Sequence, residues 1–241
     1  MSLKSLTVGI LLTGIVNCSS SKKDNAITEI YDEVKVVGAM KNVMWKGELG
    51  SKIDLDTISN KKGLYGLGPE SFLTGEILIN DGKSYVSRVI SDSAMVVKKT
   101  FDVSAPFFVY VHVYKWQEID LSAGIKSLKD LEEFINSKTA DNKRPFAFKL
   151  SGKIANAMIH IQNLPKGTKV SSPDEAHQGQ VKYQLQDETV NIIGFFSTEH
   201  KGIFTHHDSF LHMHLISQDE SKMGHLDELE IDEMKLYLPV K

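Results

Sequence analysis

The chain has 241 residues, of which 41% are hydrophobic and 24% are charged, and its formal net charge is −3 at pH 7. This composition is that of an ordinary globular protein, and without a dense basic patch carrying interleaved aromatic residues it argues against nucleic-acid binding. A single cysteine means that no disulfide can form within the chain.

The N-terminal residues 1–18 have the pattern of a signal peptide. A short basic lead precedes an apolar stretch at residues 6–16, which is too short for a membrane-spanning helix. Cys18 follows and begins a polar, serine-rich run, an arrangement that resembles the lipobox of bacterial lipoproteins, although Asn17 stands where Gly, Ala or Ser is usual. We therefore expect export and lipid anchoring to a bacterial membrane through Cys18. Ordinary secretion and a cytoplasmic location are the alternatives.

The rest of the chain divides into a tether and a folded part. Residues 19–35 are expected to form the tether, and residues 36–241 a domain that suits either one core or two sub-domains sharing a core. In the second case the boundary is expected near residues 140–150.

Apolar runs rich in β-branched and aromatic residues predict strands along most of this domain. In chain order they cover residues 76–79, 85–90, 94–98, 106–114, 146–150, 157–161, 190–196, 210–216 and 234–238. Between the first two, the pair Asp81-Gly82 is typical of a β-hairpin turn.

Two helices are predicted. One begins at Ser127, with Asp130 placed three residues later as in a capping box and an apolar face continuing through Leu131 and Ile135. A weaker helix covers residues 55–59. The predicted fold class is therefore α+β, dominated by antiparallel or mixed β-sheet with a few helices.

The glycine-rich segment 63–69 is interpreted as a tight crossing at which a side chain would clash. Phosphate binding is not indicated, because no Lys-Ser or Lys-Thr pair follows and no helix opens from it. Just beyond it lies Glu76, which by itself is typical of a solvated carboxylate at the end of a strand.

Three histidines near the C-terminus form the strongest chemical signal. His212 and His214 alternate along a predicted strand, so their side chains share one face, about 6.5 Å apart along the backbone. The polar, turn-like stretch 217–224 can bring His225 back to them. Three protein ligands with one open position are typical of a catalytic zinc site. The alternative is a pair of polar histidines on the solvent face of a strand.

Taken together, several short motifs resemble the bacterial α-acetolactate decarboxylase family, over roughly residues 40–240. The spacing of the three histidines is the most specific part. The motifs are the lead-in 44–49, Tyr65-Gly66-Leu67-Gly68, Gly75-Glu76, 81–85, Ala105-Pro106-Phe107, 145–152, Ile193-Gly194-Phe195, Gly202-Ile203 and the histidine unit 212–225.

The resemblance implies a fold, a reaction and a set of site residues. Family members decarboxylate (S)-2-acetolactate, a 2-hydroxy-3-oxo acid, to (R)-acetoin and carbon dioxide through an enediolate that a zinc ion stabilises. The zinc ligands map to His212, His214 and His225, and Glu76 matches an active-site glutamate that is the candidate for proton handling. A small-molecule substrate and a homodimer are the partners that the resemblance implies.

Several positions depart from the family pattern. Lys149 stands where the family places an arginine facing the metal pocket, and lysine lacks the planar, bidentate grip on a carboxylate. Pro69 replaces a threonine seven residues before the glutamate. The family supplies a second glutamate beyond the third histidine, and no residue here is assigned that role. A loop with His206 and His207 is longer than usual, and these two are either rim residues, alternative ligands or part of an exposed polar loop.

Three functions remain open at this point. The first is an exported acetolactate decarboxylase in which Glu76 and Lys149 take part in catalysis. The second is a divergent zinc enzyme that acts on another hydroxy-keto acid. The third is a lipoprotein that binds a metal or ligand without catalysis.

Overall fold

The structure is a computed structural model that describes Met1 and residues 33–240. The predicted signal peptide beyond Met1, Cys18 and most of the predicted tether lie outside the described residues. Within the described part, no helix is long and apolar enough to cross a membrane.

The first half of the domain forms a six-stranded antiparallel sheet with the strand order β1-β8-β3-β4-β5-β6. Its strands are β1 (Lys35–Gly38), β3 (Leu64–Pro69), β4 (Glu76–Asn80), β5 (Lys83–Ser91), β6 (Ala94–Lys99) and β8 (Phe107–His112). A short pair, β2 (Ile53–Asp54) and β7 (Ser104–Ala105), and two 3₁₀ turns, Leu55–Thr57 and Ser71–Leu73, complete this half. The turn between β4 and β5 is the predicted hairpin, with Asp81 and Gly82 both at positive φ.

The second half forms another six-stranded sheet, in the order β11-β10-β12-β13-β14-β9. Its strands are β9 (Trp116–Asp120), β10 (Phe146–Ile161), β11 (Val181–Gln186), β12 (Thr189–Phe196), β13 (Leu211–Ser217) and β14 (Met223–Pro239). The long strands β10 and β14 also pair directly, so β10, β12, β13 and β14 close into a barrel. Register shifts in the β10–β14 pairing let these strands bend around it.

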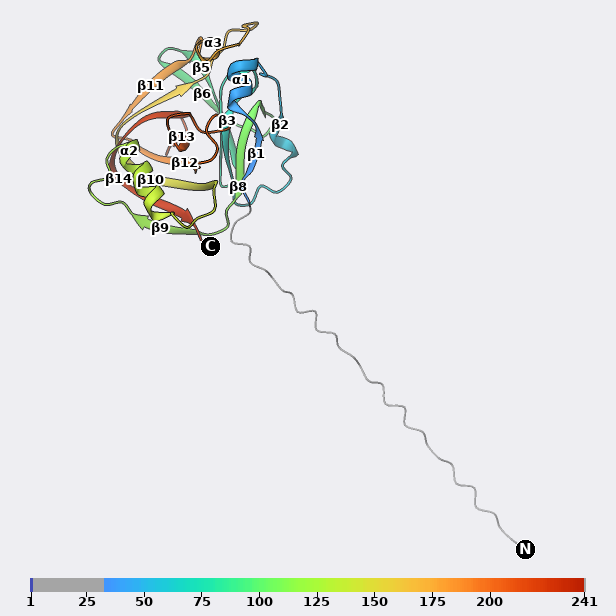
Figure 1. Cartoon of the computed structure of the whole chain (residues 1–241), viewed down its shortest axis with the longest axis vertical. Helices are drawn as coiled ribbons and strands as arrows, with labels where there is room; N and C mark the ends of the chain where they lie inside the picture. Colours follow the sequence, from blue (N-terminus) through green and yellow to red (C-terminus); the bar gives the residue numbers. More distant parts are fainter. Residues whose placement is uncertain (2–32, 241) are drawn as a thin grey trace.

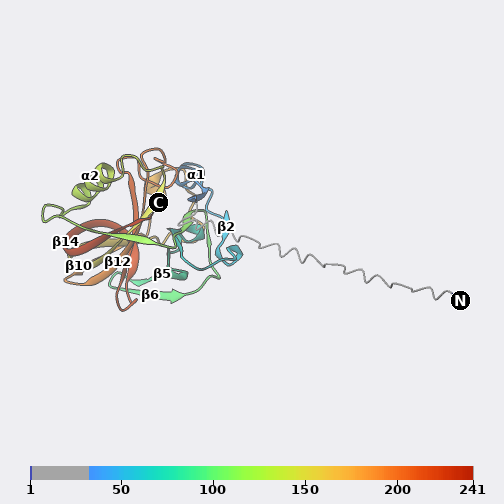
Figure 2. The same cartoon turned by 90° about the horizontal axis from the view of Figure 1, so that it is seen from below.

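The described residues also contain three α-helices: α1 (Met40–Lys46), α2 (Leu128–Lys138) and α3 (Pro173–Ala176). The predicted capping box of α2 is present, with the Ser127 hydroxyl accepting from the backbone N–H of Asp130 and the Asp130 carboxylate accepting from that of Ser127. Leu131 and Ile135 on α2 are buried against the barrel core. Figure 1 shows the barrel beside the first sheet, and Figure 2 shows α1 and α2 on the opposite side of the molecule from β5 and β6.

Strand alternation separates two apolar layers. Side chains such as Ile192, Met213 and Leu215 point into the barrel. Their neighbours Ile193, Phe195 and Ile216 point the other way and pack against Leu67, Val109 and other residues of the first sheet. The layer between the sheets is therefore where side chains from both halves of the chain meet.

The structure confirms the predicted α+β class and corrects several details. The predicted strands 146–150 and 157–161 are one continuous strand, β10, and 234–238 is only the end of β14. The strands β1, β9 and β11 and the helix α1 were not predicted. The chain passes from the first sheet to the second between His112 and Trp116.

The glycine-rich segment forms the buried strand β3 and is not a turn. The steric clash that the sequence predicts for a side chain in this segment is confirmed. A Cβ on Gly66 would lie 2.7 Å from the Phe108 ring, and one on Gly68 would lie 2.5 Å from the carbonyl oxygen of Phe107. Glycine is needed at both positions because the Phe108 ring and the Phe107 backbone of the neighbouring strand β8 occupy the space that a side chain would fill. The same two glycines make the segment harder to recognise as a strand from its sequence.

Candidate metal centre

Three histidines from two paired strands meet in the layer between the sheets. His212 and His214 lie on the same face of β13, and His225 on β14 is the cross-strand partner of His214. All three side chains are buried, and each offers a ring nitrogen within 4.8 Å of those of the other two. One ion placed among them is within reach of all three.

The three imidazoles are in the state that a metal requires. Burial lowers the pKa of His212 and His225 well below its ordinary value and lowers the pKa of His214 to about 3. At neutral pH the rings are uncharged and keep a lone pair. Among the described residues, Nδ1 of His212 and both ring nitrogens of His214 have no hydrogen-bond partner. Buried nitrogens left unpaired in this way fit a metal ion as their missing partner.

Glu76 faces this cluster from the first sheet. It is the first residue of β4 and is 2% exposed, with Oε2 lying 3.5 Å from Nε2 of His214. The backbone N–H of Gln162 donates to Oε1 at 3.3 Å. Burial raises the pKa of Glu76 well above its usual range, while burial lowers that of His214. Because burial disfavours the charged form of both groups, the contact is not a salt bridge. Because Glu76 is buried, it is not the solvated carboxylate at a strand end that its local sequence alone indicates.

A second histidine–carboxylate pair adjoins the cluster. Nδ1 of His160 lies 2.6 Å from Oδ1 of Asp227, and Nζ of Lys182 lies 3.3 Å from the other carboxylate oxygen. The His160 ring stacks on that of His225, with 4.5 Å between centroids. Asp227 thus holds one nitrogen of His160 and fixes the plane of its ring against the candidate metal ligand.

These groups share a small cavity between the sheets. It has a volume of about 30 Å³ for water-sized molecules, room for one or two waters. It is lined by Met40, Met44, Pro69, Leu73, Glu76, Phe107, His160, Gln162, His177, His206, His212 and His225.

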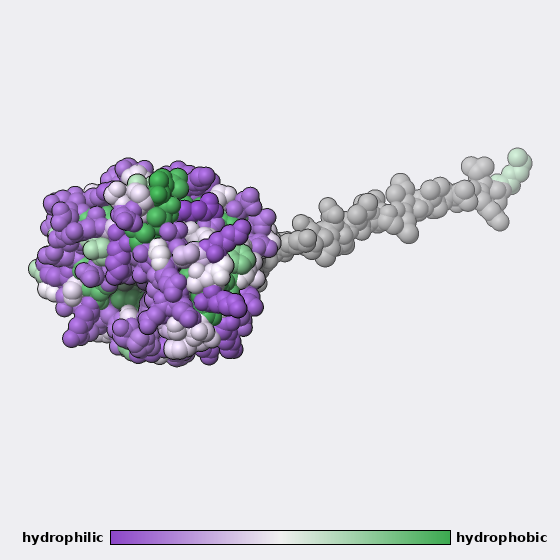
Figure 3. Space-filling model, turned by 90° about the horizontal axis from the view of Figure 1, so that it is seen from above, coloured by the Kyte–Doolittle hydropathy of each residue, from purple (hydrophilic) through white to green (hydrophobic). Residues whose placement is uncertain are grey.

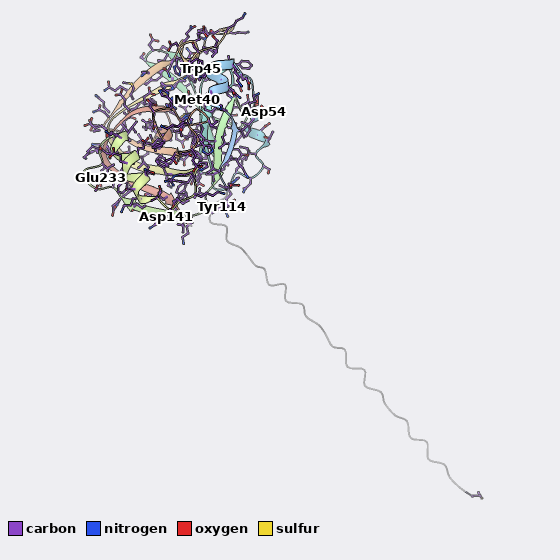
Figure 4. The ribbon with its side chains drawn as sticks, in the orientation of Figure 1. Met40, Trp45, Asp54, Tyr114, Asp141 and Glu233 are labelled. Atoms are coloured by element: carbon purple, nitrogen blue, oxygen red, sulfur yellow. The ribbon has the colours of Figure 1, made fainter. Side chains whose placement is uncertain are left out.

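Met40 lies on the part of α1 nearer the centre of the molecule, whereas Trp45 lies farther out (Figure 4).

A larger cleft of about 490 Å³ lies beside α2 and shares His206, His225 and Asp227 with this region. It joins the neighbourhood of the histidines to the surface of the molecule. The face seen from above is mainly hydrophilic, with hydrophobic residues in a few separate areas (Figure 3).

Lys149 does not line the cavity. Its ammonium lies over the rings of Tyr237 and Trp116, 4.6 Å and 5.4 Å from their centroids. Burial lowers the pKa of Lys149. The structure therefore brings together Glu76 and the three histidines from the predicted site, but it does not bring Lys149 to them.

Of the two loop histidines, His206 lines the cavity and its ring lies 5.4 Å from that of His225, whereas His207 is exposed and does not line it. Sequence reasoning missed His160, Gln162 and Asp227. The available signal was the alternation along β10, where His160 and Gln162 share a face and Ile159 and Ile161 point into the barrel.

Comparisons with known proteins show which sequences and structures the chain resembles. The sequence model of one family, described as Alpha-acetolactate decarboxylase, matches residues 37–240. An alpha-acetolactate decarboxylase from Lactococcus lactis subsp. cremoris is 24% identical over 209 residues, covering 86% of this chain and 81% of the relative. One from Methanosarcina mazei is 23% identical over 212 residues, covering 86% and 68%.

Solved structures show the same fold. The alpha-acetolactate decarboxylase of Bacillus subtilis strain 168 superposes with a TM-score of 0.69 at 20% identity, covering 87% of this chain and 86% of that one. A Staphylococcus aureus protein of unknown function, described as similar to alpha-acetolactate decarboxylase, gives 0.70 at 18% identity, covering 85% and 84%.

Proposed function

Because this chain belongs to the alpha-acetolactate decarboxylase family, a family of carboxy-lyases, we propose that it converts (S)-2-acetolactate into (R)-acetoin and carbon dioxide, with zinc held by His212, His214 and His225. The observation that carries the proposal is the meeting of three neutral, buried histidines with a buried carboxyl group, beside a cavity that His212, His225 and Glu76 line. Three nitrogen ligands and no cysteine are typical of catalytic zinc.

The reaction sets two demands. Loss of carbon dioxide from a 2-hydroxy-3-oxo acid breaks a carbon–carbon bond and sends its electron pair onto the ketone oxygen. The resulting enediolate must then take one proton on carbon to become the hydroxy ketone. When bound, zinc supplies Lewis-acid stabilisation of negative charge on the substrate oxygens.

Glu76 is suited to the proton step. A carboxyl group whose pKa is raised by burial keeps its proton near neutral pH and can give it to a carbon centre beside it. The N–H of Gln162 holds the carboxyl group in one orientation, so the proton is delivered from one side. Delivery from a fixed side accounts for a single enantiomer of product.

His160 is suited to contact the substrate. Asp227 holds its Nδ1, which leaves Nε2 as the ring nitrogen able to face a ligand in the cavity. The cavity lining contains no arginine among the described residues. This observation favours a second candidate function, a zinc enzyme of the same fold that acts on another hydroxy-keto acid.

The Glu76→Gln variant tests the proposed role. Because glutamine keeps the size of the side chain but carries no transferable proton, carbon dioxide release from 2-acetolactate is expected to fall at least about 100-fold while one zinc remains bound per chain. Zinc content is measured by elemental analysis, and Glu133→Gln, a change at an exposed site on α2, is the control. Full activity in the Glu76 variant would remove the residue from the mechanism.

The location and assembly of the enzyme belong to the same proposal. The sequence pattern of residues 1–18 supports export and a lipid anchor at Cys18, and the family resemblance supports a homodimer. Labelling cells with a radioactive fatty acid tests the anchor. The wild-type protein is expected to take up the label, and the Cys18→Ala variant is expected to remain unlabelled.

A further inference from the structure

Beside the candidate metal centre, Gln162 holds a buried side-chain oxygen that can accept a hydrogen bond. Gln162 follows the last residue of β10, is 4% exposed, and lines the cavity together with Glu76 and His160. Among the described residues, no group donates a hydrogen bond to its side-chain oxygen Oε1. A buried acceptor without a donor is unfavourable, so such a group in a native cavity calls for a ligand that supplies the donor.

The backbone fixes where this side chain lies. The N–H of Gln162 donates to Oε1 of Glu76, and two residues later the N–H of Leu164 donates to the carbonyl of Leu73. These bonds join the end of β10 to the segment that precedes β4. Gln162 and Glu76 therefore both line the cavity, with the backbone of Gln162 held against the carboxyl group proposed to handle the proton.

The chemistry of the acceptor selects the ligand group. An amide oxygen accepts and does not donate, so it binds an O–H or N–H group and gains nothing from a ketone or a carboxylate. In an ionised 2-hydroxy-3-oxo acid the hydroxyl is the only donor. A site with a buried group aimed at a substrate hydroxyl rejects an analogue that lacks it, because the buried group is then left unpaired.

We propose that the side-chain oxygen of Gln162 accepts a hydrogen bond from the hydroxyl group of the substrate, and that Gln162 thereby makes the enzyme specific for 2-hydroxy-3-oxo acids. This inference rests on the proposed function. It adds a specificity-determining residue that contacts the substrate from the end of β10, the strand paired with the one that carries His225.

A pair of unreactive ligands tests the contact directly. 2-Hydroxy-2-methylpropanoate and 2,2-dimethylpropanoate differ only in a hydroxyl in place of a methyl group, and calorimetry on the zinc-loaded full chain measures their dissociation constants. The wild-type protein is expected to prefer the hydroxy acid. In Gln162→Met, which keeps the length of the side chain but removes the amide, that preference is expected to fall about tenfold to a hundredfold with zinc content unchanged.

Two further variants keep the test decisive. Gln162→Asn retains an amide but draws it back by one methylene group, so it is expected to lose part of the preference even if the methionine variant does not fold. Gln184→Met alters an exposed glutamine on β11 and is expected to bind both ligands as the wild type does. An unchanged preference in both Gln162 variants, or no preference in the wild type, would overturn the inference.

Turnover of 2-acetolactate by the wild type separates the two proposals. If the wild type turns over acetolactate but the Gln162 variants discriminate normally, only the inference about Gln162 fails. If the wild type shows no turnover yet prefers the hydroxy acid through Gln162, the proposed decarboxylation fails and the hydroxyl contact stands.

Discussion

Glu76 and His214 show how burial sets the chemistry of single residues. In water, a glutamate side chain is charged near neutral pH and a histidine side chain is charged in mild acid. Burial disfavours the charged form of both groups, so it raises the pKa of Glu76 and lowers that of His214. Burial therefore favours the uncharged form of both groups. Two such groups 3.5 Å apart suit the proposed roles of Glu76 as proton donor and His214 as metal ligand.

Lys149 illustrates the opposite case, in which a charged residue matches a family position but lies away from the cavity. Its contacts are the faces of two aromatic rings, which favour a cation by about 0.5–1 kcal/mol each. Lys149→Met is therefore expected to lower the free energy of unfolding by about 1–2 kcal/mol and to change acetoin formation less than about threefold.

Urea unfolding and steady-state rates measure these two effects of Lys149→Met. Lys98→Met, a change at an exposed position of β6, serves as the control. A loss of activity of more than about 100-fold with zinc and stability intact would restore Lys149 as the catalytic cation that the sequence suggested.

At the level of elements, the Phe108 and Tyr110 side chains of β8 lie over Gly66 of its neighbour β3 within the first sheet. Gly66→Ala would put a methyl group 2.7 Å from the Phe108 ring and 2.9 Å from the Tyr110 side chain. Overpacking of this kind is expected to lower the free energy of unfolding by about 1–3 kcal/mol in a urea titration. Gly50→Ala, at a position with nothing within 4 Å of the added carbon, is expected to leave stability unchanged or slightly raised. Equal stability of both variants would show that the packing is looser than described.

The contrast between β3 and β13 explains how far sequence reasoning reaches. Strand β13 was predicted within one residue of its bounds because its apolar residues and alternating histidines act locally. The sequence predicts only a tight crossing at β3, because two of its residues are glycines and the reason for them lies on β8, about forty residues away. Likewise the histidine cluster follows from one hairpin, whereas His160, Gln162 and Asp227 join the site only through the long pairing of β10 with β14.

For the whole molecule, the candidate metal centre lies where the two sheets meet. The histidines come from the barrel, while Glu76, Pro69 and Phe107 on the other wall come from the first sheet. A ligand that binds only this folded arrangement stabilises it, by about 2.7 kcal/mol at a concentration 100 times its dissociation constant.

Zinc is therefore expected to raise the temperature of unfolding of the apo protein by roughly 5–10 °C under those conditions, as measured by calorimetry. His212→Ala is expected to abolish the shift, whereas His207→Ala, at an exposed position outside the cavity, is expected to retain it. The same shift in wild type and His212→Ala would mean that zinc binds elsewhere.

The most direct test of the account is acetoin formation from racemic 2-acetolactate by the purified, zinc-loaded protein, compared with the same protein after chelation. We expect zinc-dependent turnover that gives a single enantiomer of acetoin, and no turnover after chelation. A protein that binds one zinc per chain and forms no acetoin would contradict the proposed decarboxylation.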